Sequence, residues 1–251
     1  MFRVMRGAAT LGLLALNLAT ATPSPAATFE PEPSAAAEPE VVVLVHGLLR
    51  SERSMQPLAR SLSDAGYRTV ALDYPTTKLP PEELVAYVER EVATCCEGAA
   101  RLHFVTHSLG GLMVRAFLAK HRPAALGRVV MLAPPNHGSE WVDRFGDWSL
   151  FRWVLGPTAV ELGTVPTSFA QRLPPPDYEV GVIAGTTSYR LGADSVLGGE
   201  NDGTVSVAST RLDGMTDFAT VAESHTFIMR SDEVAGLVAT FLRDGRFHPA
   251  Q

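Results

Sequence analysis

Short runs of largely apolar residues recur along most of this chain. Residues 41–45 form one of these runs, and residues 102–106 form another. Continuous apolar or β-branched runs of this length are typical of strands that are buried on both faces of a sheet. The same pattern predicts further strands at 68–72, 128–132, 179–184 and 218–222.

Between these runs, apolar residues return at helical spacing. The first helical face contains Met55, Leu58, Ala59 and Leu62. Pro81 suits the first turn of a second helix, and further helices are expected over 112–119 and 234–242. Strands that alternate with helices predict the α/β fold class, with a mostly parallel central sheet and helices on both of its faces.

The composition favours one globular domain of ordinary size. Of the 251 residues, 46% are hydrophobic and only 19% are charged, so the chain can bury a large core. The formal net charge is −6, and the sequence has no basic cluster that could hold a phosphate backbone. The charge pattern therefore argues against a nucleic-acid partner.

The N-terminus has the pattern of a targeting segment. Arg3 and Arg6 precede an apolar run over 8–19, which ends in Ala-Thr-Ala. This arrangement predicts a signal peptide over residues 1–21, and the run is too short to be a transmembrane span. Residues 22–40 are rich in Pro, Ala, Thr, Ser and Glu, which predicts a flexible spacer. We therefore expect a secreted or periplasmic protein.

The two cysteines, Cys95 and Cys96, are adjacent. In an oxidising compartment a cysteine pair usually forms a disulfide. A bond between the two neighbours, a free pair and a bridge to another molecule all remain open, and we favour the first. No second Cys or His pair accompanies these cysteines at the spacing of a zinc site, so we expect no metal site.

Ser108 is the best candidate for a nucleophile. It lies in the segment Thr-His-Ser-Leu-Gly-Gly, between the strand predicted at 102–106 and the helix predicted at 112–119. A serine at a sharp strand-to-helix turn is presented above the sheet, at the positive end of the following helix. Since Ser-x-Gly is common by itself, the interpretation depends on partners elsewhere in the chain.

Those partners follow in a characteristic order. Asp202 lies in an Asn-Asp-Gly turn, and His225 follows it 23 residues later. The order Ser, Asp, His, together with a His-Gly-Leu-Leu segment after the first strand, resembles a bacterial lipase or esterase of the α/β-hydrolase superfamily. The resemblance covers residues 41 to about 243. It implies that residues 41–251 form one catalytic domain with the α/β-hydrolase fold.

The resemblance also implies a role for each residue. Ser108 would attack an ester carbonyl, His225 would accept and return the proton, and Asp202 would orient the imidazole. The backbone N–H groups of Leu48 and Leu109 would form the oxyanion hole. One departure from the family pattern is Thr106, which stands where G-x-S-x-G has glycine; we expect a slightly more open elbow.

Other acids and histidines compete for the same roles. Asp194 and Asp213 are the rivals of Asp202, which ranks first because it precedes a segment, 204–207, that we expect to be extended as in the family. The other histidines are interpreted as structural or as parts of backbone motifs. They are His46, His103, His107 and His121, whereas His248 is expected in a frayed tail and His137 near the mouth of the site.

Residues 138–176 do not fit the alternation of strands and helices. This segment contains all three tryptophans of the chain. In the superfamily, an insertion at this point forms a cap over the active site, and clustered aromatic rings suit an acyl-chain pocket. The alternative is that the rings pack the cap onto the main domain. The predicted substrate-binding residues are Leu49, Tyr74, His137, Trp141 and Trp153.

Taken with the resemblance, the residues predict an ester hydrolase of lipase or esterase type. It would act on a small-molecule or lipid ester through an acyl-enzyme, without a cofactor and with at most transient contact with a lipid interface. An acyltransferase with the same triad and an alcohol acceptor is the alternative. A non-catalytic lipid- or partner-binding module is a more distant one.

Overall fold

The computed structural model describes residues 40–248. The predicted signal peptide and all but the last residue of the predicted spacer lie outside this range, so export of the protein stays a prediction. Within residues 40–248, no helix has the length and apolar character needed to cross a membrane.

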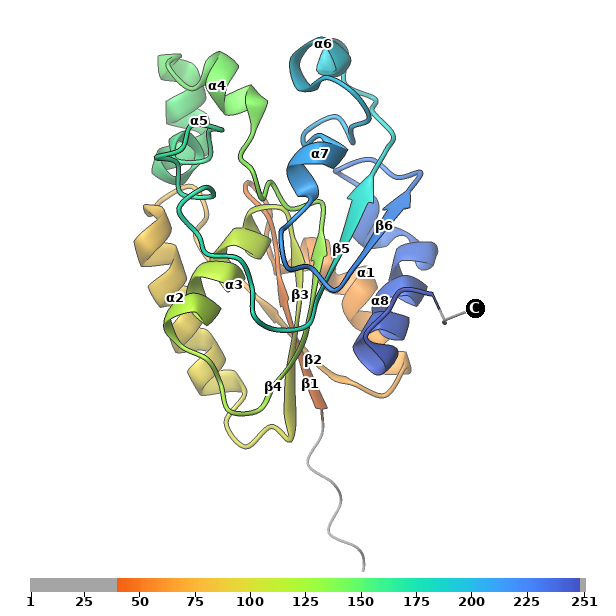
Figure 1. The fold of residues 1–251 in the computed structure, drawn as a ribbon. Coiled ribbons are helices and arrows are strands. Elements are labelled where there is room, and N and C mark those ends of the chain that lie inside the picture. Colours follow the sequence, from red (N-terminus) through yellow and green to blue (C-terminus); the bar gives the residue numbers. More distant parts are fainter. Residues whose placement is uncertain (1–39, 249–251) are drawn as a thin grey trace, which may run out of the picture. The chain divides into compact units, whose positions relative to one another are not determined.

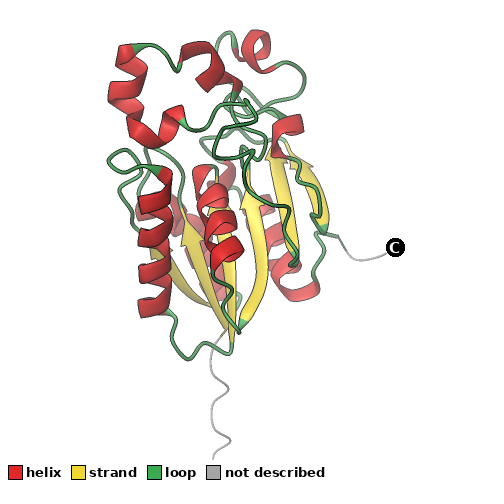
Figure 2. Cartoon of the chain, turned by 60° about the vertical axis from the view of Figure 1, so that its left-hand side comes forward, coloured by secondary structure: helices red, strands yellow, loops and turns green. Residues whose placement is uncertain are grey.

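The core of the described chain is a six-stranded sheet in which all strands are parallel, in the order β2-β1-β3-β4-β5-β6 (Figures 1 and 2). The predicted α/β fold class is therefore confirmed. The strands are β1 (Glu40–Val45), β2 (Arg68–Leu72), β3 (Arg101–His107), β4 (Leu126–Leu132), β5 (Val180–Gly185) and β6 (Asp217–Val221). Their bounds differ from the predicted ones by two residues or fewer.

Helices cover both faces of the sheet. On one face lie α1 (Gln56–Asp64) and α8 (Asp232–Asp244), and on the other lie α2 (Pro81–Cys95) and α3 (Leu109–Lys120) (Figure 1). Side chains along β1 alternate between the two layers: Val42 and Leu44 pack with α1 and α8, whereas Val43 packs with α2 and α3. Burial on both faces explains why the strand is continuously apolar.

In residues 40–248 six helices remain: two short 3-10 helices, which add Met55 and Ile228 to the core layer of α1 and α8, and four α-helices, which lie beyond the carboxyl ends of the strands (Figure 1). They are η1 (Glu52–Met55), α4 (Glu140–Phe145), α5 (Ser149–Val160), α6 (Ala193–Leu197), α7 (Val207–Thr210) and η2 (Ile228–Arg230). Within the expected cap, the rings of Trp141 and Phe145 stack with their centroids 5.5 Å apart. The Thr158 hydroxyl donates to the Leu79 carbonyl oxygen at 2.6 Å, which ties α5 to the segment before α2.

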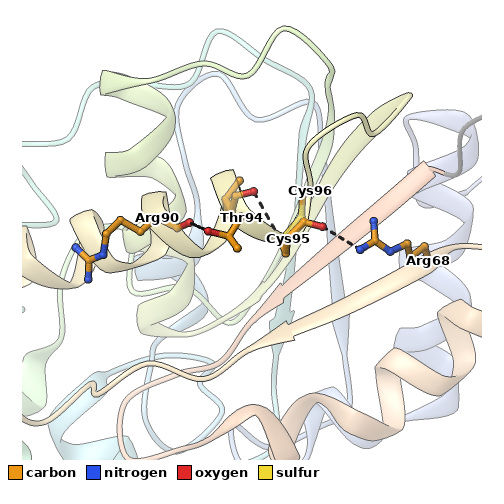
Figure 3. Close-up of a disulfide and its surroundings, with 6 residues drawn as sticks. Arg68, Arg90, Thr94, Cys95 and Cys96 are labelled. Atoms are coloured by element: carbon orange, nitrogen blue, oxygen red, sulfur yellow. Dashed lines mark hydrogen bonds between the residues drawn. A yellow bond between two sulfur atoms is a disulfide. The ribbon is translucent and has the colours of Figure 1, made fainter.

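Cys95 and Cys96 form a disulfide between adjacent residues at the end of α2 (Figure 3). The Arg68 guanidinium donates to the Cys95 carbonyl oxygen at 2.9 Å. This hydrogen bond satisfies one of the carbonyls that every helix leaves unpaired at its C-terminus, and it links the end of α2 to the start of β2.

Candidate active site

Ser108 occupies a sharp turn between β3 and α3. Its backbone has φ 52° and ψ −123°, a conformation that is rare for a residue with a side chain. The Ser108 N–H donates to the Leu132 carbonyl oxygen at 2.9 Å, and its own carbonyl accepts from the Gly111 N–H at 2.9 Å. These bonds hold the strained residue in place.

The turn brings the start of α3 very close to the end of β1. A Cβ at Gly110 would overlap the Val45 carbonyl oxygen, and a Cβ at Gly47 would lie 2.8 Å from His107 Nδ1. Only residues without a side chain fit at these two points.

Replacing Gly110 with alanine should therefore lower the free energy of unfolding by about 1–3 kcal/mol, since the added methyl overpacks the helix–strand contact. Gly236→Ala is the matched control. It lies in α8 with no atom within 4 Å of the added Cβ, and alanine there should stabilise the helix by up to about 1 kcal/mol. Urea unfolding of both variants measures the difference, and a similar shift in both would contradict the close approach.

Thr106 is buried beneath the turn, where the family pattern has glycine. The space for its side chain comes from Gly111. A Cβ at Gly111 would lie 3.3 Å from Thr106 Oγ1 and 3.2 Å from Pro134 Cβ. Gly111, the second glycine of the Gly-Gly pair, thus leaves the space that the Thr106 side chain occupies.

Three residues that lie far apart in the chain form one hydrogen-bonded row. His225 Nε2 lies 3.1 Å from Ser108 Oγ, and His225 Nδ1 lies 2.7 Å from Asp202 Oδ2. All three side chains are largely buried, with exposed fractions of 9% for Ser108, 2% for Asp202 and 8% for His225. This is the nucleophile–base–acid geometry of a serine hydrolase triad.

Asp202 is held by its own turn. Its Oδ1 accepts from the N–H groups of Thr204 and Val205 at 2.9 and 2.8 Å, and its carbonyl oxygen accepts from the His225 N–H at 3.0 Å. The expectation of an extended 204–207 segment is wrong. The Asp202 side chain bends the backbone into a tight turn, Asn201 and Ser206 form a single antiparallel bridge, and α7 begins at residue 207.

The two rival acids lie elsewhere. Asp194 Oδ1 accepts from the Asn201 side-chain amide at 2.9 Å, so it supports the loop that carries Asp202. Asp213 is exposed after α7.

The predicted oxyanion hole has the required backbone groups close to Ser108. Leu109 is the first residue of α3, so its N–H has no acceptor within the helix. In the hydrogen bonds of residues 40–248, the Leu48 N–H likewise has no acceptor, whereas the next N–H, that of Leu49, donates to Thr76 Oγ1 at 3.3 Å. Both Leu48 and Leu109 line the same cavity as Ser108.

That cavity has a volume of about 420 Å³ and is mainly apolar. Ser108 and His225 form part of its wall, and both cap helices contribute side chains. Its apolar lining includes Leu48, Leu109, Val142, Leu155 and Leu162. A nucleophile with its base therefore faces a space that suits an apolar substrate group.

The sequence pattern of the alpha/beta hydrolase family matches residues 42–240. This chain belongs to the alpha/beta hydrolase family. The resemblance on which the sequence analysis relied is thus confirmed, and the hydrolase fold places Ser108 at the end of a central strand, where the family carries its nucleophile.

Solved structures share the hydrolase fold at low sequence identity. The mature form of lipase BlEst2 from Bacillus licheniformis is 21% identical with a TM-score of 0.62, covering 83% of this chain and 92% of that chain. The metagenomic carboxyl esterase MGS0156 is 23% identical with a TM-score of 0.62, and the match covers 80% of this chain and 69% of that chain. Phospholipase PlaB from Legionella pneumophila is 17% identical with a TM-score of 0.64, and the match covers 80% of this chain and 57% of that chain. No curated protein matches the sequence.

Of the five predicted substrate-binding residues of this hydrolase, the structure brings Leu49 and Trp141 to the cavity. The other three do not line it, which corrects the prediction. Tyr74 is buried beside β1, where its hydroxyl donates to the His46 carbonyl oxygen at 2.6 Å. Trp153 is 82% exposed on α5. His137 is exposed, and its backbone N–H donates to Ser209.

Sequence reasoning missed the part played by His107. Its Nε2 donates to the His225 carbonyl oxygen at 3.0 Å, and its ring lies 4.7 Å from that of His225. Complete burial keeps the pKa of His107 well below its usual range, so the ring is neutral at pH 7. His107 therefore fixes the loop that carries the base. Its position directly before the nucleophile was the available signal.

Two further histidines make their contacts outside the triad. His103 is buried, accepts from the Arg128 N–H at 2.9 Å and contacts Glu40 at 3.2 Å. His121 lies 3.3 Å from Glu89 on the surface. Within residues 40–248, no group of three or more His, Cys, Asp or Glu residues is arranged to hold a metal ion.

Proposed function

We propose that this alpha/beta hydrolase cleaves carboxylic esters in the manner of a lipase or esterase. The observation that carries the proposal is the hydrogen-bonded row of Asp202, His225 and Ser108 at the wall of a mainly apolar cavity. The family match and the fold shared with a lipase and a carboxyl esterase support it.

The proposed reaction begins at Ser108. As its Oγ attacks the ester carbonyl carbon, His225 Nε2 takes the hydroxyl proton, and the N–H groups of Leu48 and Leu109 donate to the developing oxyanion. The bond from the carbonyl carbon to the alcohol oxygen breaks, and the alcohol leaves with the proton from His225. Water then adds to the acyl-enzyme with His225 again as base, and releases the carboxylic acid and free Ser108.

A panel of p-nitrophenyl esters from acetate to palmitate tests the proposal. We expect release of p-nitrophenol by the wild-type protein and none above background by Ser108→Ala. Folded wild-type protein that cleaves no ester of the panel, or a Ser108→Ala variant that remains active, would reject ester hydrolysis at this serine. In the first case, transfer of an acyl group to an alcohol would be tested next.

The cap tryptophans allow a paired test of acyl-chain preference. Trp141 lines the cavity, so Trp141→Ala should enlarge it and move the preferred chain length toward longer esters. Trp153 is 82% exposed and does not line the cavity, so Trp153→Ala should leave the preference unchanged. The ratio of kcat/KM values across the ester panel measures both effects. A shift in Trp153→Ala alone would place the acyl chain on the outer side of α5.

A further inference from the structure

The charged side chains at the wall of the cavity are all positive. Among the residues that line it, Arg50 and Arg190 are the charged side chains, and no aspartate or glutamate is among them. This contrasts with the whole chain, whose formal net charge is −6. An anion inside the cavity would therefore meet positive charge close to Ser108.

Arg50 lies in the loop that also provides Leu48 for the proposed oxyanion hole. Its N–H donates to the Gly47 carbonyl oxygen at 3.3 Å, which fixes the loop. The side chain is partly buried, and no carboxylate within residues 40–248 forms an ion pair with it. A partly buried guanidinium without a carboxylate keeps unused hydrogen-bond donors.

The charge that acts on the pKa of Arg50 has the same sign. Burial lowers the pKa of Arg50, and the positive charge of Arg230 lowers it further. The charge of Arg50 in turn helps to lower the pKa of His107, the residue next to the nucleophile. Arg50 and Arg230 line the same surface hollow and repel each other, and an anion bound to Arg50 would offset this repulsion.

Arg190 reaches the cavity from the segment between β5 and α6. Its guanidinium lies over the ring of Trp141, 4.9 Å from the centroid. In the described part of the chain Arg190 also has no carboxylate partner. This cation–π contact holds the guanidinium at the cavity wall, where its N–H groups can donate to an anion.

We propose that Arg50 and Arg190 bind a negatively charged group on the alcohol part of the substrate, so that the preferred substrates are anionic acyl esters. The proposal rests on the proposed function, because the ester is cleaved at Ser108. The apolar wall accepts the acyl chain, and the arginines accept a phosphate or carboxylate carried by the leaving alcohol, for which a guanidinium is well suited.

Two pairs of hexanoyl esters test the proposal. One pair is hexanoyl glycerol phosphate and hexanoyl glycerol, and the other is hexanoyl lactate and hexanoyl lactamide. The short chain keeps all four dissolved as monomers, so binding to a lipid surface does not contribute. We expect kcat/KM for the anionic member of at least one pair to be higher by about 10-fold, the effect of one charge-assisted hydrogen bond. The pair that responds identifies the anion.

Arg50→Gln and Arg190→Gln should each reduce this preference by about 3-fold, as expected if the two arginines share it equally, and added salt should also reduce it because partly exposed charges are screened. Arg60→Gln is the matched control, since Arg60 is exposed on α1 and does not line the cavity; its preference should equal that of the wild type. Because two separate arginine variants are measured, a folding defect in one of them still leaves the other to test the proposal.

The outcomes separate this proposal from the proposed function. Hydrolysis of the neutral esters at Ser108 without any preference for the anionic ones would overturn anion recognition and leave ester hydrolysis in place. A preference that persists in both arginine variants would also overturn it. Failure to cleave any of the four esters would overturn anion recognition, and it would overturn the proposed function as well if the protein also cleaves no p-nitrophenyl ester.

Discussion

Replacing Ser108 with alanine is expected to lower kcat for ester hydrolysis by about 10⁶-fold, the effect of removing the nucleophile from a serine hydrolase triad. Without Oγ no acyl-enzyme can form, and the residual rate comes only from substrate binding and the oxyanion hole. The fold should persist, because the hydroxyl contacts His225 Nε2 while the turn is held by backbone bonds to Leu132 and Gly111.

The measurement is release of p-nitrophenol under saturating ester, with urea unfolding of the same samples. Ser63→Ala is the matched control. Ser63 is an exposed serine on α1 whose hydroxyl pairs with Thr69, so its removal should leave kcat unchanged. A loss of only about 10-fold in Ser108→Ala, at unchanged stability, would mean that another group performs the attack.

Asp202→Asn is expected to lower kcat by about 10⁴-fold, and the cause is a change of tautomer at His225. Asp202 Oδ1 already accepts two backbone N–H groups. An asparagine oxygen would keep those bonds and thereby turn its NH₂ group toward His225 Nδ1. That nitrogen would then have to act as an acceptor, so the proton would move to Nε2, and Nε2 could no longer take the proton of Ser108.

The stability of the variant and a matched control distinguish this cause from a structural defect. Asp213→Asn removes the same charge at an exposed position and should retain full activity. Urea unfolding of Asp202→Asn should give a stability close to that of the wild type, since the asparagine oxygen keeps both backbone hydrogen bonds. Full activity of Asp202→Asn at neutral pH would instead assign the acid to another residue, with Asp194 next in line.

His107 and Asp202 together explain why the base is so well placed. His225 is held through its backbone N–H by the Asp202 carbonyl and through its backbone carbonyl by the ring of His107, in addition to the side-chain bond to Asp202. Three hydrogen bonds, two from Asp202 and one from the end of β3, thus fix the backbone and the imidazole of His225. Positioning of this kind lets a general base act without reorganisation during the reaction.

The local sequence pattern alone predicted the fold class, because a strand that is buried on both faces consists of consecutive apolar residues. Val42, Val43 and Leu44 must all be apolar since both faces of β1 are covered, and a run of this kind can be recognised without knowing its neighbours. The nucleophile was also visible locally, because a strand-to-helix turn at Ser108 requires small residues close by. The order of the strands and the uniformly parallel sheet required the structure.

Only the tertiary structure decided what surrounds the nucleophile. Sequence reasoning expected Tyr74 and Trp153 at the cavity; the structure instead has Tyr74 bonded to His46 and Trp153 exposed, and it brings in Arg50 and Arg190. The physical reason is that a pocket is formed by loops from separate strand ends. Periodicity reports whether a residue is buried in its own element, whereas the identity of its spatial neighbours depends on how distant segments pack against one another.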